Sequence, residues 1–275
     1  MTSYLITGAT GRLGGSALDA LLALIRADDI HVLVRSSADS ERLTALGVTA
    51  HLGSYADPAS LRAAFTGVDR LLFVSSPALD PAVRTTQHRN VVAAAIESGV
   101  AHLVYTSAMG ADHDPGHGST ESALAESGMG RTILRNALYT EPFVAQALTD
   151  AAGGVVRSAS GPERLATASI ADLAEAAVRA LIDPPAPAVW ELRGPAWSFP
   201  ELAEALTRQL GRPIAPRQVD DAEAGAFAPL FPLVRRGAFA TETDDLAALL
   251  GRPPRGIAEV VAEMVAEVIA ERPHP

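Results

Sequence analysis

The sequence predicts an α/β fold in which helices cover both faces of a doubly wound parallel sheet, followed by a smaller C-terminal lobe. Up to about residue 140, short apolar runs alternate with segments of helical apolar spacing. The runs at 70–76 and 102–108 are almost continuously apolar, which is typical of strands buried on both faces. The chain has 275 residues, of which 48% are hydrophobic, and this is enough for a large domain with a small lobe.

The elements of the first part follow one another in alternation. The expected strands are 4–7, 30–35, 48–53, 70–76, 102–108 and 131–137. The expected helices are 14–27, 57–67, 86–99 with Gly99 as its C-terminal cap, and a short helix at about 121–126. Because crossovers between parallel strands are right-handed, ligand-binding residues should gather at the carboxyl ends of the strands.

The pattern loosens after about residue 150. A helix is expected at 169–182 with Ser169 as its N-cap, followed by a strand at 188–194 and helices at 198–211 and 244–251. The segment 227–240 contains Phe227, Phe231 and Phe239. These rings suit either the wall of an apolar substrate pocket or a packed pair of helices.

The overall composition excludes several classes of function. The net charge of −10 disfavours nucleic acid and anionic lipid as partners. The sequence has no cysteine, so disulfides, thiolate nucleophiles and zinc-thiolate sites are excluded. With neither a secretory signal nor an apolar run long enough for a membrane span, we expect a soluble, cytoplasmic protein. The expected partner is a small molecule, and a homodimer is left open.

A glycine-rich loop joins the first strand to the first helix. In "ITGATGRLGG", Gly8 permits the tight turn, Gly11 lets the backbone approach a pyrophosphate, and Gly14 lets the helix pack closely on the strand. The helix N-terminus offers free N–H groups to phosphates. The loop is expected to bind a dinucleotide through Gly8, Ala9, Thr10, Gly11, Arg12, Leu13 and Gly14. We therefore predict a Rossmann domain at 1–150 and a smaller α/β substrate lobe at 151–275, partly interleaved with it.

The residue at the end of the second strand indicates which dinucleotide is bound. An acidic residue there would bind the ribose hydroxyls of NAD, but the chain has Arg35. A guanidinium suits a 2′-phosphate, and Arg12 could add to it. The alternative is a solvated arginine at a strand end. The sequence therefore favours NADP(H) over NAD(H).

Longer stretches of the chain resemble one family. "GATGRLG", "QHRNVVAAAIESGV", "YTS" and "LRNALYTEPF" are similar to stretches of the NmrA-like atypical short-chain dehydrogenases. The likeness covers nearly the whole chain and is closest to the flavin-free NAD(P)H:quinone oxidoreductase type. Besides the glycine loop and Arg35, it implies cofactor contacts from three strand ends, namely Ser75 and Ser76, Tyr105, Thr106 and Ser107, and Asn136, Ala137 and Leu138.

The chain departs from this family at three positions. Gly118 stands where a short-chain dehydrogenase has its catalytic tyrosine, and Ser122 where similar quinone reductases have lysine. Ile170 replaces an arginine that helps to hold the cofactor in similar proteins. Without the tyrosine and lysine, reduction of a simple ketone is disfavoured, whereas a quinone can be protonated from water or from a nearby histidine.

Two residues are candidate proton donors. His117 matches a family histidine and has a suitable ordinary pKa, and Tyr139 could offer its phenol to a substrate. The alternatives are a surface histidine and a core tyrosine. "DHDPGH" contains metal-ligand residue types, but Pro115 and Gly116 interrupt it, so we expect a polar loop over the cofactor cleft instead.

Two functions therefore remain. The first is an NADPH-dependent oxidoreductase that transfers a hydride to a quinone or a related conjugated carbonyl without the tyrosine and lysine pair. The alternative is an NADP(H)-binding redox sensor or regulatory protein of NmrA type that does not turn over. An epimerase is disfavoured, because similar epimerases keep the tyrosine and lysine.

Overall fold

The computed structural model describes residues 2–186 and 188–270. The described residues form two compact units, one made of 2–136 with 173–186 and 188–191, and the other of 137–172 with 192–270. Within the described ranges, no helix is both long enough and apolar enough to cross a membrane.

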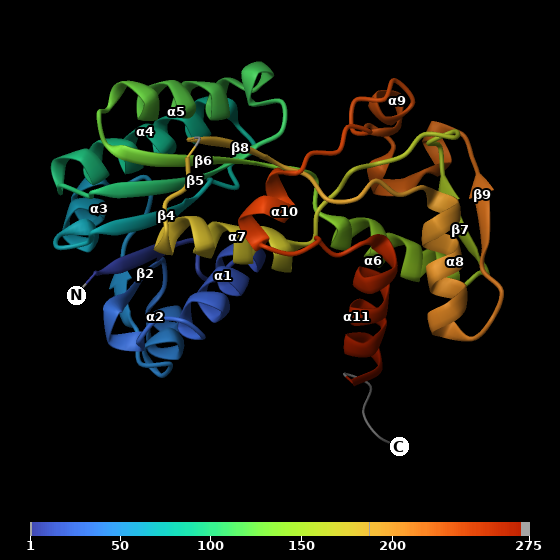
Figure 1. Ribbon diagram of the computed structural model, residues 1–275, viewed down its shortest axis with the longest axis horizontal. Helices are drawn as coiled ribbons and strands as arrows, with labels where there is room; N and C mark the ends of the chain where they lie inside the picture. The colour runs from blue at the N-terminus through green and yellow to red at the C-terminus, as the bar shows by residue number, and fades with distance from the viewer. Residues whose placement is uncertain (1, 187, 271–275) are drawn as a thin grey trace. The chain divides into compact units, whose positions relative to one another are not determined.

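The first unit is built on a seven-stranded sheet. Its strands are β1 (Tyr4–Thr7), β2 (Ile30–Val34), β3 (Thr49–Leu52), β4 (Arg70–Val74), β5 (His102–Ala108), β6 (Gly130–Asn136) and β8 (Val189–Leu192). They lie in the order β3-β2-β1-β4-β5-β6-β8 (Figure 1). Each neighbouring pair from β3 to β6 is parallel. The order reverses between β1 and β4, which is the point where open α/β sheets bind their ligands.

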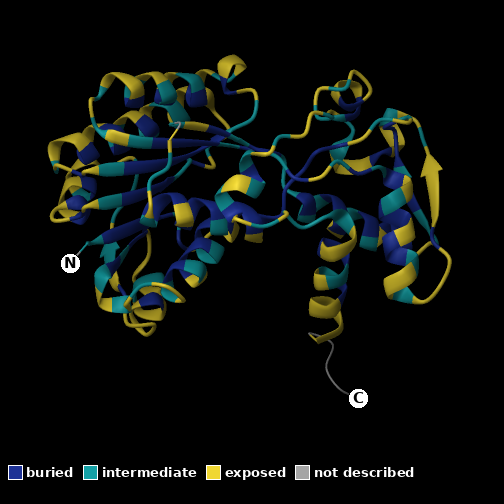
Figure 2. Cartoon of the chain, in the orientation of Figure 1, coloured by how far each residue is buried: buried dark blue, intermediate teal, exposed yellow. Residues whose placement is uncertain are grey.

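Helices cover both faces of this sheet. The helices of this unit are α1 (Arg12–Leu22), η1 (Ala27–Asp29), α2 (Ser37–Thr44), α3 (Pro58–Phe65), α4 (Pro81–Glu97), η2 (Ala111–His113), α5 (Pro115–Glu126) and most of α7 (Ile170–Ile182). Leu61 and Phe65 of α3, Val91 of α4 and Leu124 of α5 share a buried core with the sheet. Figure 1 shows α1 and α7 on the opposite side, and Figure 2 shows buried residues along the central strands. The predicted doubly wound parallel sheet is confirmed.

Two helices begin earlier than the sequence pattern indicated. α4 starts at Pro81 rather than at residue 86, and α5 starts at Pro115 rather than near residue 121. In each case an aspartate carboxylate, from Asp80 or Asp114, accepts hydrogen bonds from N–H groups of the first turn. Proline suits the first helical position because its φ is fixed and it lacks an N–H that would need a partner. The prediction of a loop before residue 121 was therefore wrong.

Two predicted helix ends are confirmed. Gly99 follows α4 with a φ of +74°. Ser169 Oγ accepts a hydrogen bond from the N–H of Asp172 at 3.1 Å, at the start of α7. These local signals depend on single side chains or a single backbone angle, and for that reason the sequence alone can indicate them.

The chain passes between the two units more than once. The first unit ends at 136 and resumes at 173, and β8 then lies beside β6 in the large sheet. The expected domain boundary at 150 falls inside α6 (Thr140–Ala151). The division into cofactor and substrate domains stays a prediction.

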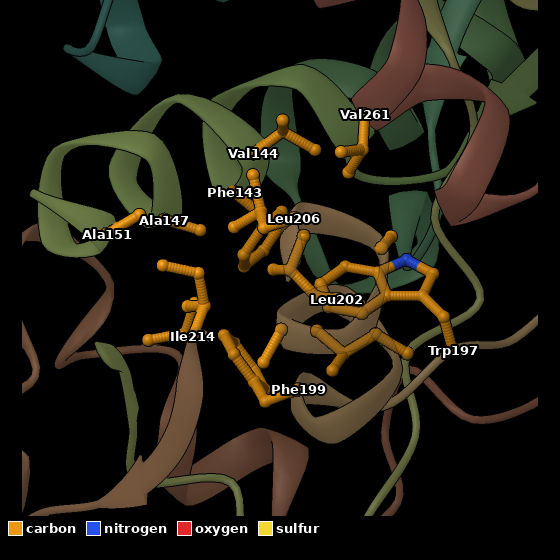
Figure 3. Close-up of a cluster of buried hydrophobic side chains, with 14 of the residues drawn as sticks. Phe143, Val144, Ala147, Ala151, Trp197, Phe199, Leu202, Leu206, Ile214 and Val261 are labelled. Carbon is orange, nitrogen blue, oxygen red and sulfur yellow. The ribbon is translucent and has the colours of Figure 1, made fainter. Parts of the chain in front are cut away.

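The second unit encloses an aromatic core (Figure 3). Phe143 stacks on Phe227 with 4.2 Å between ring centroids, and Trp197 meets Phe143 edge-on at 5.7 Å. Phe231 is 1% exposed, so the segment 227–240 contributes to this core, with one short helix instead of a helix pair. The remaining elements are β7 (Val155–Ser158), which is parallel to β9 (Ala215–Gln218), α6, α8 (Phe199–Leu210), η3 (Asp221–Glu223), η4 (Gly225–Phe227), α9 (Phe231–Val234), α10 (Asp245–Leu250) and α11 (Ile257–Ala270).

Candidate functional site

The glycine loop forms a tight turn between β1 and α1. Gly8 has a φ of +66°, a conformation that favours glycine, and its carbonyl accepts a hydrogen bond from the N–H of Gly11 at 2.9 Å. A Cβ atom at Gly14 would lie 2.1 Å from the Gly8 carbonyl oxygen, so α1 can sit on the turn only with glycine there. Leu13 and Ala9 are buried, whereas Thr10 and Gly11 are exposed. The exposed backbone of this loop is open to a ligand.

A half-buried tyrosine supports the base of the loop. The Tyr55 hydroxyl lies 2.5 Å from Thr7 Oγ1 and 2.7 Å from the carbonyl oxygen of Val74. Thr7 Oγ1 also accepts a hydrogen bond from the N–H of Val74 at 3.0 Å. These bonds join β1 to β4 where the strand order reverses. The sequence did not indicate Tyr55, because its partners lie 48 and 19 residues away.

The N-terminus of α1 is suited to an anion. Gly11 is its N-cap, and no side chain caps the first turn. Arg12 and Arg35 are both exposed, and neither forms an ion pair with any residue that the structure describes. The free N–H groups, the positive end of the helix dipole and two free guanidinium groups are features of a phosphate site.

Side chains from β5 and α4 hold the backbone that follows β4. Thr106 Oγ1 accepts a hydrogen bond from the N–H of Ser75 at 3.0 Å, and His88 Nε2 accepts one from the N–H of Ser76 at 2.9 Å. Ser76 and Thr106 are buried. These contacts fix the backbone at the two strand ends and leave the cofactor role of the three predicted residues a prediction.

Tyr105 and His117 meet inside the first unit. The Tyr105 hydroxyl lies 2.7 Å from His117 Nδ1, and both side chains are buried. Burial lowers the pKa of His117 and raises that of Tyr105. A neutral imidazole whose Nδ1 is already bonded is a weak proton donor, which bears against the role expected for His117 as a general acid.

A second polar cluster surrounds Ser107. Its hydroxyl donates a hydrogen bond to Glu121 Oε1 at 2.6 Å, and Arg135 donates to both oxygens of that carboxylate at 2.6 to 3.2 Å. Arg135 also pairs with Asp112 at 3.0 Å and with Glu191 at 3.1 Å. The hydrogen bond to Glu121 is the main cause that raises the pKa of Arg135 above its ordinary value. The sequence predicted Ser107 but missed Glu121 and Arg135.

Asn136, at the end of β6, has an unsatisfied polar atom. Its side-chain Oδ1 is buried and has no hydrogen-bond partner among the described residues, and the whole residue is 6% exposed. A buried acceptor without a partner costs about 1–3 kcal/mol, so such an atom is a natural place for a ligand N–H or O–H group.

The residues after Asn136 belong to the second unit. Ala137 is buried, and its N–H donates to the Leu192 carbonyl at 3.0 Å. Leu138 packs against the aromatic core. Tyr139 is half-buried at the N-cap of α6, and its backbone forms a bridge with Ala168.

A hollow of about 540 Å³ lies over the N-terminal half of α5. Its lining includes Gly118 and Ser122, the positions of the missing tyrosine and lysine. The other lining residues are Asp112, His113, Asp114, Pro115, Ser119 and Glu121. Asp114 caps α5 and pairs with Arg84 at 3.0 Å, and no group of three potential metal ligands occurs within the described ranges.

Ile170, at the position of the missing arginine, is buried in the second unit. Its N–H donates to Glu141 Oε1 at 2.6 Å. This bond joins the first turn of α7 to α6, so the backbone at position 170 has a structural role that does not depend on the side chain.

Comparison with known proteins gives consistent matches. A family model described as NAD(P)H-binding matches residues 8–184. The chain is 34% identical to quinone oxidoreductase 2 of Escherichia coli strain K12, over 94% of this chain and 96% of that protein. The crystal structure of an NADPH-dependent quinone oxidoreductase from Escherichia coli complexed with NADPH aligns with a TM-score of 0.83 at 33% identity, covering 97% and 99% of the two chains. Citrobacter sp. triphenylmethane reductase complexed with NADP(H) aligns with a TM-score of 0.88 at 31% identity, covering 95% and 99%.

Proposed function

The chain belongs to the NAD(P)H-binding family, and from this premise we propose that it transfers a hydride from NADPH to a quinone or a related conjugated carbonyl. It is an NAD(P)H-dependent oxidoreductase acting on small molecules. The preference for NADPH and the quinone class of acceptor are the proposed parts. The open N-terminus of α1, with Arg12 and Arg35 beside the glycine loop, is the observation that carries the proposal.

The chain's own residues fit a bound dinucleotide. The backbone of 8–14 would hold the pyrophosphate, and Arg35 would hold the 2′-phosphate that distinguishes NADP from NAD. Ser75, Ser76, Tyr105, Thr106 and Ser107 would form the strand ends beside it, together with Asn136, Ala137 and Leu138. The unpartnered Oδ1 of Asn136 supports this assignment because a ligand donor would satisfy it.

The class of substrate that accepts the hydride depends on which side chains can also donate a proton to it. When bound, reduced nicotinamide supplies the hydride. The Ser107 proton is bonded to Glu121, and the Tyr105 hydroxyl is buried against His117. His117 and Tyr139 stay the proposed donors, but neither replaces a tyrosine activated by a lysine. A quinone suits such a site because its reduced oxygens can take protons from water.

The alternative is an NADP(H)-binding sensor without turnover. The observation that favours it is the pair Gly118 and Ser122, which line the hollow at the positions of the missing tyrosine and lysine. A sensor would bind NADP(H) and a protein partner while leaving quinones unreduced.

One assay separates the two functions. Purified protein is mixed with NADPH or NADH and with a panel of benzoquinones, naphthoquinones and simple ketones, and loss of the reduced nicotinamide absorbance is followed. We expect turnover with quinones, a preference for NADPH and little turnover with ketones. NADPH binding without any turnover would support the sensor. Sedimentation velocity tests the homodimer, which stays a prediction.

A further inference from the structure

The carboxylate of Glu121 fixes the direction of the Ser107 hydroxyl. Ser107 Oγ donates to Glu121 Oε1 at 2.6 Å, and the residue is 3% exposed. A hydroxyl has one proton and two lone pairs, so a serine whose proton is bound to a carboxylate offers only lone pairs to a third group. Any ligand that reaches Ser107 must therefore approach with an O–H or N–H donor.

Arg135 fixes Glu121 in turn. The guanidinium contacts both oxygens of the carboxylate, with its shortest bond at 2.6 Å from Oε2. Both side chains are mostly buried, with 18% of Arg135 and 11% of Glu121 exposed. A planar guanidinium bonded to both oxygens fixes the plane of the carboxylate, and a carboxylate accepts hydrogen bonds but does not donate them.

The position of Ser107 in the sheet indicates the half of the ligand that it meets. The strand order reverses between β1 and β4, and a dinucleotide crosses the sheet at such a point, with one half over each set of strands. The glycine loop and Arg35 lie at the ends of β1 and β2, so the adenosine half belongs there. The end of β5, which carries Ser107, belongs to the nicotinamide half.

We propose that Glu121, held by Arg135, is a positioning residue that makes Ser107 a hydrogen-bond acceptor for the nicotinamide riboside half of the cofactor. The donor would be a ribose hydroxyl or the carboxamide N–H group. Ser122, at the lysine position, is exposed and donates to the Gly118 carbonyl at 3.0 Å. In this arrangement Ser107 would hold the nicotinamide riboside half by accepting a hydrogen bond, whereas a lysine would hold it by donating one. This inference rests on the proposed cofactor function.

Two ligands separate the two halves of the cofactor. NADP⁺ contains both halves, whereas adenosine 2′,5′-bisphosphate lacks the nicotinamide riboside. Calorimetric titration of Ser107→Ala and Glu121→Gln should show NADP⁺ binding weakened about fivefold, the effect of one hydrogen bond, with binding of the bisphosphate unchanged. Glu126→Gln is the matched control: it removes one carboxylate from the same helix at an exposed position, and both affinities should stay as in the unsubstituted protein.

A double substitution tests whether Glu121 acts through Ser107. If it does, Ser107→Ala with Glu121→Gln should bind NADP⁺ no more weakly than Ser107→Ala alone. Additive losses, or equal losses for both ligands, would overturn the inference. Ser107→Ala leaves the ion pair of Glu121 and Arg135 in place, so an unchanged NADP⁺ affinity in this variant would overturn the inference even where Glu121→Gln fails to fold.

The failure of this inference is distinct from the failure of the proposed function. An unsubstituted protein that binds both ligands, with variants that bind NADP⁺ equally well, would overturn the positioning role alone. An unsubstituted protein that binds neither ligand would overturn the cofactor function and the positioning role together.

Discussion

The hydroxyl of Tyr105 lies 2.7 Å from Nδ1 of His117, in a buried group that also contains His88. His88 Nε2 accepts the N–H of Ser76, so the proton of a neutral His88 is on Nδ1, which lies 2.9 Å from Thr120 Oγ1. The two imidazole centroids are 5.9 Å apart. Burial is the main reason why the pKa of each histidine is lowered, and the pKa of His88 falls to about 4. Both histidines are therefore neutral at neutral pH.

Acid should destabilise the protein through this group. The unfolded chain binds a proton on His88 near its ordinary pKa of 6.5, whereas the folded chain binds it only near 4. Between these values the unfolded state holds more protons, so the free energy of unfolding falls as the pH falls from 6.5 towards 4, by about 3 kcal/mol at most. Because the pKa of His117 is also lowered, His117 adds to this loss of stability at acidic pH. Urea unfolding over this pH range measures the effect.

His88→Gln is the control for this prediction. A glutamine can accept the Ser76 N–H and donate to Thr120, but it does not titrate. The variant should therefore lose stability less steeply on acidification than the unsubstituted protein. Equal slopes for the two proteins would show that His88 is not the group responsible.

The sequence predicts those parts of the molecule that depend on local patterns. The apolar runs identify β1 to β6, and the glycine spacing identifies the turn before α1. The starts of α4 and α5 are missed because each depends on a single capping aspartate, Asp80 or Asp114, followed by a proline at the first helical position, and not on apolar spacing.

The candidate site is predicted only where a motif is continuous. Gly8 to Gly14 can be read from the sequence. By contrast, Ser107 and Arg135 each contact Glu121 from 14 residues away, one on either side of it in the chain. Which carboxylate a half-buried arginine meets depends on how β5, β6 and α5 pack, and no local pattern contains that information. The same is true of Tyr55, whose hydroxyl joins two strands far apart in the chain.

Gly14→Ala should disrupt the glycine loop. The new Cβ would lie 2.1 Å from the Gly8 carbonyl oxygen, a backbone atom that cannot move without shifting the turn. We expect a loss of about 1–3 kcal/mol in stability and a much weaker affinity for NADP⁺. Gly15→Ala is the control, because its Cβ would meet only the Ala9 carbonyl oxygen at 3.5 Å. That variant should be as stable or up to about 1 kcal/mol more stable. Equal thermal shifts for the two would contradict the argument.

Arg35→Ala should remove the preference for NADPH. The loss of a charge-assisted bond of about 1.5–3 kcal/mol to the 2′-phosphate should weaken NADPH binding by about tenfold or more and leave NADH binding unchanged. Arg42→Ala, at another exposed arginine seven residues further on that pairs with Asp39, should change neither affinity. Titration with both cofactors checks this, and a parallel loss for NADH would mean that Arg35 does not recognise the phosphate.

Asp172→Asn should destabilise the second unit. The carboxylate of Asp172 is fully buried, accepts the N–H of Arg255 at 2.7 Å and pairs with the side chains of Arg252 and Arg255. An asparagine keeps the shape but removes the buried charge that both guanidinium groups contact, although Arg255 keeps its pair with Glu263 at 2.9 Å. Breaking a buried pair costs up to about 3–5 kcal/mol. Chemical denaturation should show this loss. On the same helix, Glu175→Gln removes the charge of a more exposed carboxylate, whose i,i+4 pair with Arg179 contributes about 0.3–0.5 kcal/mol. Similar losses for the two substitutions would contradict the prediction, because they would show that the charge of Asp172 does not hold the segment around 252–255 in place.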